Sequence, residues 1–167
     1  MSLSLQNISV VTPDGEFNIL IDDESVAYAS GFANVTELTK RLPSWVQPAA
    51  ISHLSAHPYQ LLVERYYEGD TEALDKIHYL QAGTDFQKKV WNAIKSIPYG
   101  KTISYKELAR QSGNEAAIRA AGTICGLNRL ILIVPCHRVL KSDGGIGNYL
   151  YGSAIKESLL KHELAIA

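Results

Sequence analysis

Short runs of strand-forming residues, bounded by turn residues, make up much of the first third of the chain and predict β-strands. Three runs carry this pattern, residues 4–11, 17–21 and 26–33, and they contain many β-branched and aromatic side chains. A Pro-Asp-Gly turn at 13–15 separates the first two runs, and an acidic turn at 22–25 precedes the third. Because short turns join antiparallel neighbours, the pattern predicts an antiparallel sheet.

Two helices are predicted to follow these strands. Asn34, with Glu37 three residues later, is a helix-start signal, and this helix ends at about Leu42, before a proline. The second helix begins near Pro58 and stops at Gly69. The front of the chain therefore combines a sheet with helices.

The back half contains stronger helix signals. Thr84 and Gln87 form a capping box for a helix whose apolar positions recur at helical spacing. Ser104 with Glu107 opens a second helix, which Gly113 closes. A third helix, over about 115–126, follows immediately with Asn114 as its cap. Helix, short turn and helix in this order form the pattern of a helix-turn-helix.

The third helix carries two different stripes. Cys125 falls on the apolar stripe, which predicts a buried structural thiol. The other stripe holds three small side chains and one arginine: Ala116, Arg119, Ala120 and Thr123. Small residues let a helix lie close to another surface, so the stripe fits either a ligand surface or tight packing against another helix.

Composition and charge divide the chain in two. Its 167 residues are 46% hydrophobic and 20% charged, which excludes a disordered protein. We expect an N-terminal α/β domain (1–78), a linker (79–83) and a C-terminal domain (84–167). Residues 1–83 have four basic and eleven acidic side chains, net −7, whereas residues 84–167 have twelve and six, net +6. The back half is therefore the candidate for a polyanionic partner, although ordinary solvated faces give such charges too.

We expect neither a membrane anchor nor a metal. The longest aliphatic run, residues 130–134, reads as a buried strand and is far shorter than the ~20 residues of a membrane span. Two cysteines and no apparent leader favour a cytoplasmic protein (nucleoid or nucleus in a eukaryote). His53, His57 and His78 have no cysteine or carboxylate at metal-ligand spacing.

Candidate chemistry lies after this run, at Cys136 and His137. On the last helix, which begins near Ser153, the ~100° step per residue places Glu163 between Leu159 and Leu160 on the apolar face. A buried carboxylate needs a partner, and His137 is available. Cysteine, histidine and carboxylate are the parts of an activated nucleophile. The alternatives are a structural cysteine and a frayed helix end.

The segment Val134-Pro135-Cys136-His137-Arg138-Val139, with Asn128 before it and Gly147-Asn148-Tyr149 after it, resembles the active-site signature of O6-alkylguanine-DNA alkyltransferases. The resemblance runs from about Thr84 to Glu163 and is weaker over residues 1–83. It implies a two-domain α/β protein, with a ribonuclease-H-like antiparallel sheet and helices in front and a mostly helical domain with a helix-turn-helix behind.

The family implies repair of DNA by direct damage reversal. An O6-alkylguanine is flipped out of duplex DNA, and its alkyl group passes irreversibly to Cys136 in a single turnover without a cofactor. By this resemblance, His137 is expected to take the thiol proton through a water, Glu163 to stabilise the imidazolium, and Tyr105 to contact the base and rotate a phosphate. The helix-turn-helix enters the minor groove through Ala116, Ala120 and Thr123, while Arg119 fills the gap left by the base. Asn128 is a structural hinge, and the pocket residues are Val139, Asn148, Tyr149, Leu150 and Tyr151.

The sequence departs from the family pattern at four positions. Arg129 and Ile131 stand where relatives commonly have proline, and Leu150 and Tyr151 replace a frequent serine and glycine. We expect Tyr151 to narrow the pocket, so that methyl adducts are accepted and a benzyl group is disfavoured. The zinc ligands of some relatives have no match in residues 1–83. We expect a monomer, although the opposite charges of its halves also allow cooperative binding on DNA.

Three other functions are compatible with parts of the sequence. A non-enzymatic lesion-binding protein of the alkyltransferase-like type binds the same base, but such proteins replace the cysteine that is present here as Cys136. A Cys-His-Glu hydrolase would turn over and leaves Arg119 unexplained. A helix-turn-helix regulator leaves the buried Glu163 unexplained and would prefer particular DNA sequences.

Overall fold

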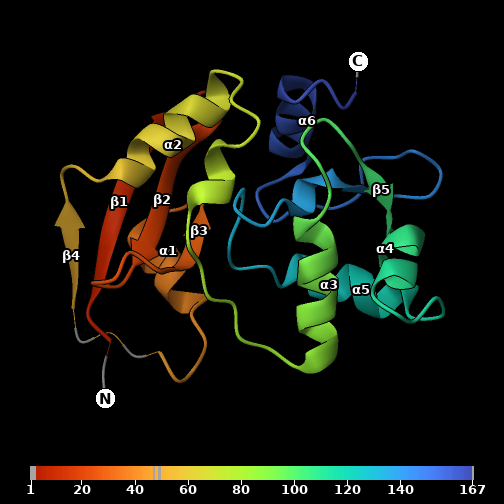
Figure 1. Cartoon of the computed structure of the whole chain (residues 1–167), viewed down its shortest axis with the longest axis horizontal. Helices are drawn as coiled ribbons and strands as arrows, with labels where there is room; N and C mark the ends of the chain where they lie inside the picture. The colour runs from red at the N-terminus through yellow and green to blue at the C-terminus, as the bar shows by residue number, and fades with distance from the viewer. Residues whose placement is uncertain (1–2, 47, 49, 167) are drawn as a thin grey trace. The chain divides into compact units, whose positions relative to one another are not determined.

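The computed structural model describes residues 3–46, 48 and 50–166, which form two compact units (Figure 1). The front unit comprises the residues up to Ala82 together with Arg129–Ile133, and the back unit comprises Gly83–Asn128 and the residues from Val134 onward. The division differs from the sequence-based boundary because the short segment 129–133 belongs to the front unit.

A four-stranded sheet forms the centre of the front unit. Its strands are β1 (Leu5–Thr12), β2 (Gly15–Ile21), β3 (Ala27–Gly31) and β4 (Ile51–Leu54), in the order β3-β2-β1-β4. The three predicted strands are confirmed, and β1 pairs antiparallel with β2, as β2 does with β3. Strand β4, which pairs parallel with β1, was not predicted from the sequence. This edge strand is short and has no fully buried residue, so it lacks an apolar pattern.

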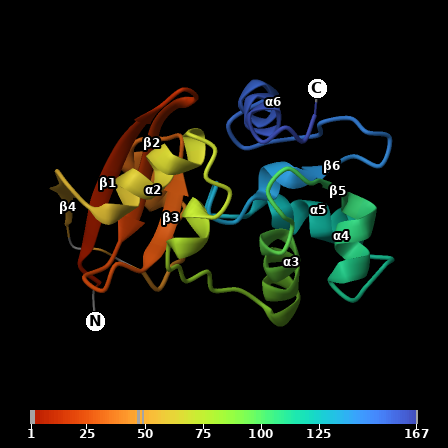
Figure 2. The same ribbon diagram turned by 45° about the horizontal axis from the view of Figure 1, so that its top comes forward.

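Two α-helices and one 3-10 helix complete the front unit: α1 (Val35–Lys40), α2 (Pro58–Tyr67) and η1 (Ala73–Lys76). The predicted start of α1 is confirmed, since the Asn34 side chain accepts a hydrogen bond from the backbone N–H of Glu37. Leu38 of α1 is buried in a core cluster with Leu5 and Leu20 of the sheet. Helix α2 packs on β1, as both views of the ribbon show (Figure 2).

The strand predicted over residues 130–134 is wrong. Leu130 makes a single bridge to Ser30, and the next residues form a turn in which Leu132 has a positive φ of 69°. Ser30 holds the turn with its side chain, which donates to the carbonyl of Ile131 (2.7 Å), and with its N–H, which donates to Arg129 (2.9 Å). A run of buried aliphatic residues does not by itself distinguish a strand from a turn that crosses an interior.

The back unit is mostly helical. Its elements are α3 (Asp85–Lys95), β5 (Ile103–Ser104), α4 (Tyr105–Gln111), α5 (Ile118–Gly126), η2 (Cys136–Arg138), β6 (Val139–Leu140) and α6 (Ser153–His162). The capping box at Thr84 and the cap at Ser104 are confirmed. Helices α3, α4 and α5 pack against one another, and the Trp91 indole of α3 donates to the carbonyl of Ile124 in α5 (3.1 Å).

The predicted start of the third helix is wrong by three residues. Asn114 accepts a hydrogen bond from the N–H of Ala116 (3.2 Å), but the chain then turns and α5 begins only at Ile118. An asparagine that bonds to the backbone two residues on favours a local turn as readily as a helix cap. Gly113 has a positive φ of 92°, as expected for a residue that ends a helix.

Among the described residues, no helix has the length and apolarity to cross a membrane. Within the same part of the chain, no three His, Cys, Asp or Glu side chains cluster as a metal site would require.

A histidine caps α2. His57 Nδ1 accepts the N–H of Tyr59 (3.1 Å), and the Gln60 side chain accepts the N–H of His57 (3.2 Å). Since Nδ1 is an acceptor, the neutral ring carries its hydrogen on Nε2 and donates to Ser25 Oγ (3.1 Å). The cap therefore requires an uncharged imidazole.

We expect the free energy of unfolding to fall in acid as this cap is lost. Burial lowers the pKa of His57 below 6.5. Its contribution is therefore complete above the unfolded pKa and is lost as the pH falls through the folded one. His57→Asn supplies a cap that does not titrate. The free energy of unfolding is measured by urea denaturation. Between roughly pH 8 and pH 5, that of the unaltered chain should fall by about 1 kcal/mol relative to that of this variant. A difference that does not vary with pH would contradict the assignment.

Candidate active site

Cys136 begins η2 and lies in the interior of the back unit, 6% exposed. The preceding segment is fixed by Asn128, whose side-chain amide donates to the carbonyl of Val134 (2.8 Å) and which is itself buried. The prediction that Asn128 has a structural role thus has a physical basis. Its amide connects the end of α5 to the residues that precede the cysteine.

The surroundings of Cys136 favour a thiolate. Hydrogen bonding from the Cys125 thiol lowers the pKa of Cys136, and the Asn128 amide and the Lys156 ammonium lower it further, against the effect of burial. The same thiol–thiol hydrogen bond and burial raise the pKa of Cys125. Cys125 Sγ also lies 3.8 Å from the carbonyl oxygen of Cys136. The prediction that Cys125 is buried is confirmed, and Cys136 is the thiol that ionises first.

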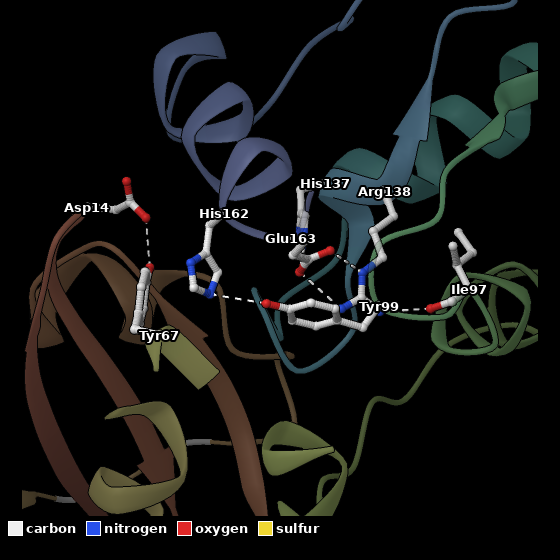
Figure 3. Close-up of polar contacts among 8 residues, drawn as sticks. All are labelled: Asp14, Tyr67, Ile97, Tyr99, His137, Arg138, His162 and Glu163. Atoms are coloured by element: carbon white, nitrogen blue, oxygen red, sulfur yellow. Dashed lines mark hydrogen bonds and ion pairs between the residues drawn. The ribbon is translucent and has the colours of Figure 1, made fainter. Parts of the chain in front are cut away.

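His137 and Arg138 meet at the carboxylate of Glu163 (Figure 3). The imidazole Nε2 of His137 lies 2.8 Å from Glu163 Oε2, and both side chains are fully buried. Glu163 follows α6 as its C-cap residue and is only 2% exposed, which confirms the prediction that it points into the core. Within the described part of the chain, His137 Nδ1 has no hydrogen-bond partner.

The pKa values of this pair favour a neutral imidazole beside a carboxylate. Burial raises the pKa of Glu163, but hydrogen bonds and charge from His137 and Arg138 outweigh it and hold that pKa well below its usual range. Burial lowers the pKa of His137, although the Glu163 carboxylate opposes this effect. His137 therefore donates from Nε2 to Glu163 and presents the lone pair of Nδ1 as a base.

Lys156 is a site residue that was not predicted from the sequence. It is fully buried in α6, and its ammonium donates to the carbonyls of Val139 (2.7 Å) and Asn148 (3.2 Å). The same ammonium lies 5.8 Å from the ring centre of Tyr105. The helical spacing that places Glu163 on the apolar face of the last helix places Lys156 on the same face. The burial of Lys156 could therefore have been predicted from the sequence.

The expected pocket residues occupy the segment around this lysine. Val139 is buried in β6, Tyr149 and Tyr151 are half-buried with their rings 6.2 Å apart edge to face, and Leu150 is exposed. Asn148 is also exposed, and its carbonyl reaches Lys156. Burial raises the pKa of Tyr105, so its phenol stays protonated. Gly147 has φ +78°, and a Cβ there would lie 3.3 Å from the Tyr105 hydroxyl.

The predicted stripe of small residues and an arginine is exposed, as a ligand surface requires, with three members on α5 and Ala116 in the turn before it. Its four members line a shallow groove of about 560 Å³ together with Gln87 of α3 and three further residues of α5 and its ends: Ala117, Ile124 and Leu127. Tight packing of this stripe against another helix of the unit is therefore excluded. Arg119 is the basic side chain of this groove.

Comparison with known proteins identifies the family. The family model for the DNA binding domain of 6-O-methylguanine DNA methyltransferase matches residues 85–165. A methylated-DNA–protein-cysteine methyltransferase of Methanosarcina acetivorans is 36% identical over 152 residues, 91% of this chain and 94% of that protein. The chain belongs to the methylated-DNA–protein-cysteine methyltransferase family. The family predicted from the motif around Cys136 is thereby confirmed.

Further members extend the comparison. The Methanosarcina barkeri member of the family is 46% identical over 101 residues, 60% of this chain and 63% of that protein. The crystal structure of the Mycobacterium tuberculosis OGT in complex with DNA matches with a TM-score of 0.80 at 30% identity, covering 96% of this chain and 93% of that one. The α/β fold class that the sequence implies is confirmed.

We expect iodoacetamide to label Cys136 before Cys125 near neutral pH, since their pKa values are shifted in opposite directions. Asn128→Ala removes a hydrogen bond that lowers the pKa of Cys136. Labelling should slow roughly three- to tenfold near neutral pH and recover in alkali, because one pKa unit changes the thiolate fraction about tenfold. Peptide mass spectrometry measures both rates.

The matched control is Asn18→Ala. Asn18 is equally buried and hydrogen-bonded, but lies in the front unit. This variant should keep the labelling rate of Cys136. Equal labelling of the two cysteines, or an unchanged rate in Asn128→Ala, would show that the site does not favour the thiolate.

Proposed function

We propose that this chain repairs DNA by moving the alkyl group of an O6-alkylguanine onto Cys136, once per molecule. The observation that carries the proposal is the buried thiol with a lowered pKa, next to a histidine whose Nε2 is held by Glu163. Family membership supports it, because the curated relatives are named as methyltransferases that act on methylated DNA through a cysteine.

The transfer is a displacement at saturated carbon. Cys136 gives its proton to Nδ1 of His137 through a bridging water, and the resulting thiolate attacks the alkyl carbon as the bond from carbon to O6 breaks. The guanine takes up one proton by way of Tyr105 and leaves as a neutral base. This proton balances the one that Cys136 gave to His137, so the net change exchanges the thiol hydrogen for the alkyl group. Both electrons of the new bond come from sulfur, so the step needs no cofactor. The product is a thioether that water does not cleave, and each chain therefore acts once.

The groove on α5 is the proposed surface for contact with duplex DNA. In this proposal the chain binds as a monomer and from the minor-groove side. Ala116, Ala120 and Thr123 present little bulk, which suits a narrow groove, and Arg119 extends beyond them to fill the space of the extruded base. The Mycobacterium tuberculosis relative was crystallised with DNA, which supports DNA as the partner. Reading damage through an everted base requires no sequence preference.

Incubation with a duplex oligonucleotide that contains O6-methylguanine tests the proposal. We expect one methyl group per chain, located on Cys136 by peptide mass spectrometry, and no further reaction with excess substrate. Cys136→Ala should abolish transfer and leave duplex binding within about twofold, since the thiol lies beneath the base and not at the phosphates. Repeated turnover would favour a hydrolase, and binding without transfer would favour a lesion-binding protein.

Arg119→Ala should weaken binding to the damaged duplex by about tenfold. It should also slow repair in duplex DNA more than reaction with the free base, because the arginine replaces the base within the stack. Electrophoretic mobility shift and single-turnover kinetics measure the two effects. Arg110→Ala is the matched control, since Arg110 is an exposed arginine of α4 paired with Glu107. Equal slowing with duplex and free base would contradict the role of Arg119.

Tyr151 is proposed to restrict the size of the alkyl group. It stands half-buried beside Tyr149 in the segment that the family uses for the pocket. Tyr151→Ala should raise the rate with O6-benzylguanine relative to O6-methylguanine, measured as single-turnover rates with the free bases. If the unaltered chain reacts equally fast with both, the proposed restriction does not exist.

A further inference from the structure

Arg138 lies at the centre of the buried network but has no part in the transfer described above. Its guanidinium donates from Nε to Glu163 Oε1 (2.8 Å) and from Nη2 to Oε2 (3.0 Å), and from Nη1 to the carbonyl of Ile97 (2.7 Å). The residue is 8% exposed. Three of its donors are therefore used inside the protein, two of them on one carboxylate.

Arg138 and His137 share an acceptor. Oε2 of Glu163 accepts from Nη2 of Arg138 and lies 2.8 Å from Nε2 of His137 (Figure 3). A carboxylate bound at both oxygens by a guanidinium stays anionic and keeps a fixed orientation. Its remaining contact to His137 must be filled by an N–H, which places the hydrogen of the neutral ring on Nε2.

Three charged groups act on His137. Glu163 at the end of α6 attracts an imidazolium, whereas Arg138 in η2 and Lys156 in α6 repel it. Removal of Arg138 leaves a buried carboxylate next to the ring and only Lys156 to oppose it. An imidazole beside an unpaired buried carboxylate gains a second proton more readily. The second proton would occupy Nδ1, the atom that faces no partner among the described residues.

Two residues after α3, Tyr99 and Gly100, also pack near Arg138 and Glu163. The Tyr99 ring centre lies 5.7 Å from the guanidinium carbon, and the Tyr99 hydroxyl is 3.3 Å from Nε2 of His162. Gly100 has φ +80°, and a Cβ there would lie 3.1 Å from the carbonyl of Glu163. Tyr99 therefore lies against Arg138, and Gly100 lies against the backbone of Glu163.

We propose that Arg138 is a positioning residue of this site, which holds Glu163 as a fixed anion so that His137 keeps Nδ1 open for the proton of Cys136. The inference rests on the proposed function for its kinetic consequence. Three residues then activate Cys136, namely His137, Glu163 and Arg138, and the arginine acts through the carboxylate without touching the substrate.

The test compares Arg138→Met and Arg138→Lys with the unaltered chain. Nitrogen-15 NMR of the His137 ring should show the Nε2–H tautomer near neutral pH in the unaltered chain, and a pKa raised by about one unit or more in Arg138→Met. The acid limb of the pH–rate profile, where the methyl-transfer rate falls as the pH is lowered, should shift to higher pH together with this pKa. Below the raised pKa the rate should fall about tenfold per pH unit, and it should recover above that pKa. Arg138→Lys, which keeps the charge without the paired hydrogen bonds, should shift less.

Two further variants make the outcome decisive. Arg138→Met combined with Glu163→Gln removes the unpaired carboxylate, so it should fold even where Arg138→Met does not, and its acid limb should lie at or below that of the unaltered chain. Arg110→Met breaks an exposed arginine–glutamate pair of the same kind on α4 and should leave the limb unchanged.

An unchanged His137 pKa and an unchanged pH dependence of transfer in folded Arg138→Met would show that Arg138 is only structural and would overturn the proposal. A raised limb in the double variant would overturn it equally. If the unaltered chain transfers no methyl group, the proposed function fails, but the NMR measurement still decides the role of Arg138.

Discussion

A buried carboxylate must be paired, and the back unit is arranged around the pairing of Glu163. Removing a carboxylate from water costs several kcal/mol, which only well-aligned donors recover. Arg138 and His137 supply those donors, and each comes from the short helix that begins at Cys136. The position of the carboxylate at the end of α6 therefore fixes both the rotation of η2 and the tautomer of the imidazole next to the cysteine.

The pairing of Glu163 also assigns different roles to the two ring nitrogens of His137. Nε2 of His137 is committed to Glu163, whereas Nδ1 is left for chemistry. On the other side of the site, Lys156 holds two backbone carbonyls, and its charge favours a thiolate at Cys136. The Lys156 ammonium thus favours the thiolate form of Cys136, and the Glu163 carboxylate favours the imidazolium form of His137.

Local signals in the sequence predicted much of the fold and of the site. The strands of the front sheet, the caps at Asn34, Thr84 and Ser104, and the inward direction of Glu163 all follow from spacing over a few residues. Four residues of the groove on α5 were likewise predicted as one stripe: Ala116, Arg119, Ala120 and Thr123.

What the sequence did not predict depends on contacts between distant segments. The aliphatic run 130–134 is a turn because Ser30 bonds to it, and β4 is a strand because β1 pairs with it. Arg138 was visible only as part of a motif, and its role depends on Glu163, 25 positions later. Periodicity reports which face is buried, but not which buried charges meet.

The most direct test of the account is a crystal structure of Cys136→Ser bound to a duplex that contains O6-methylguanine. The account predicts that the modified base lies outside the stack, with its methyl carbon in contact with the hydroxyl at position 136 and Arg119 in the space that the base left. A modified base that remains stacked in the duplex, or an everted base that contacts another surface, would contradict it.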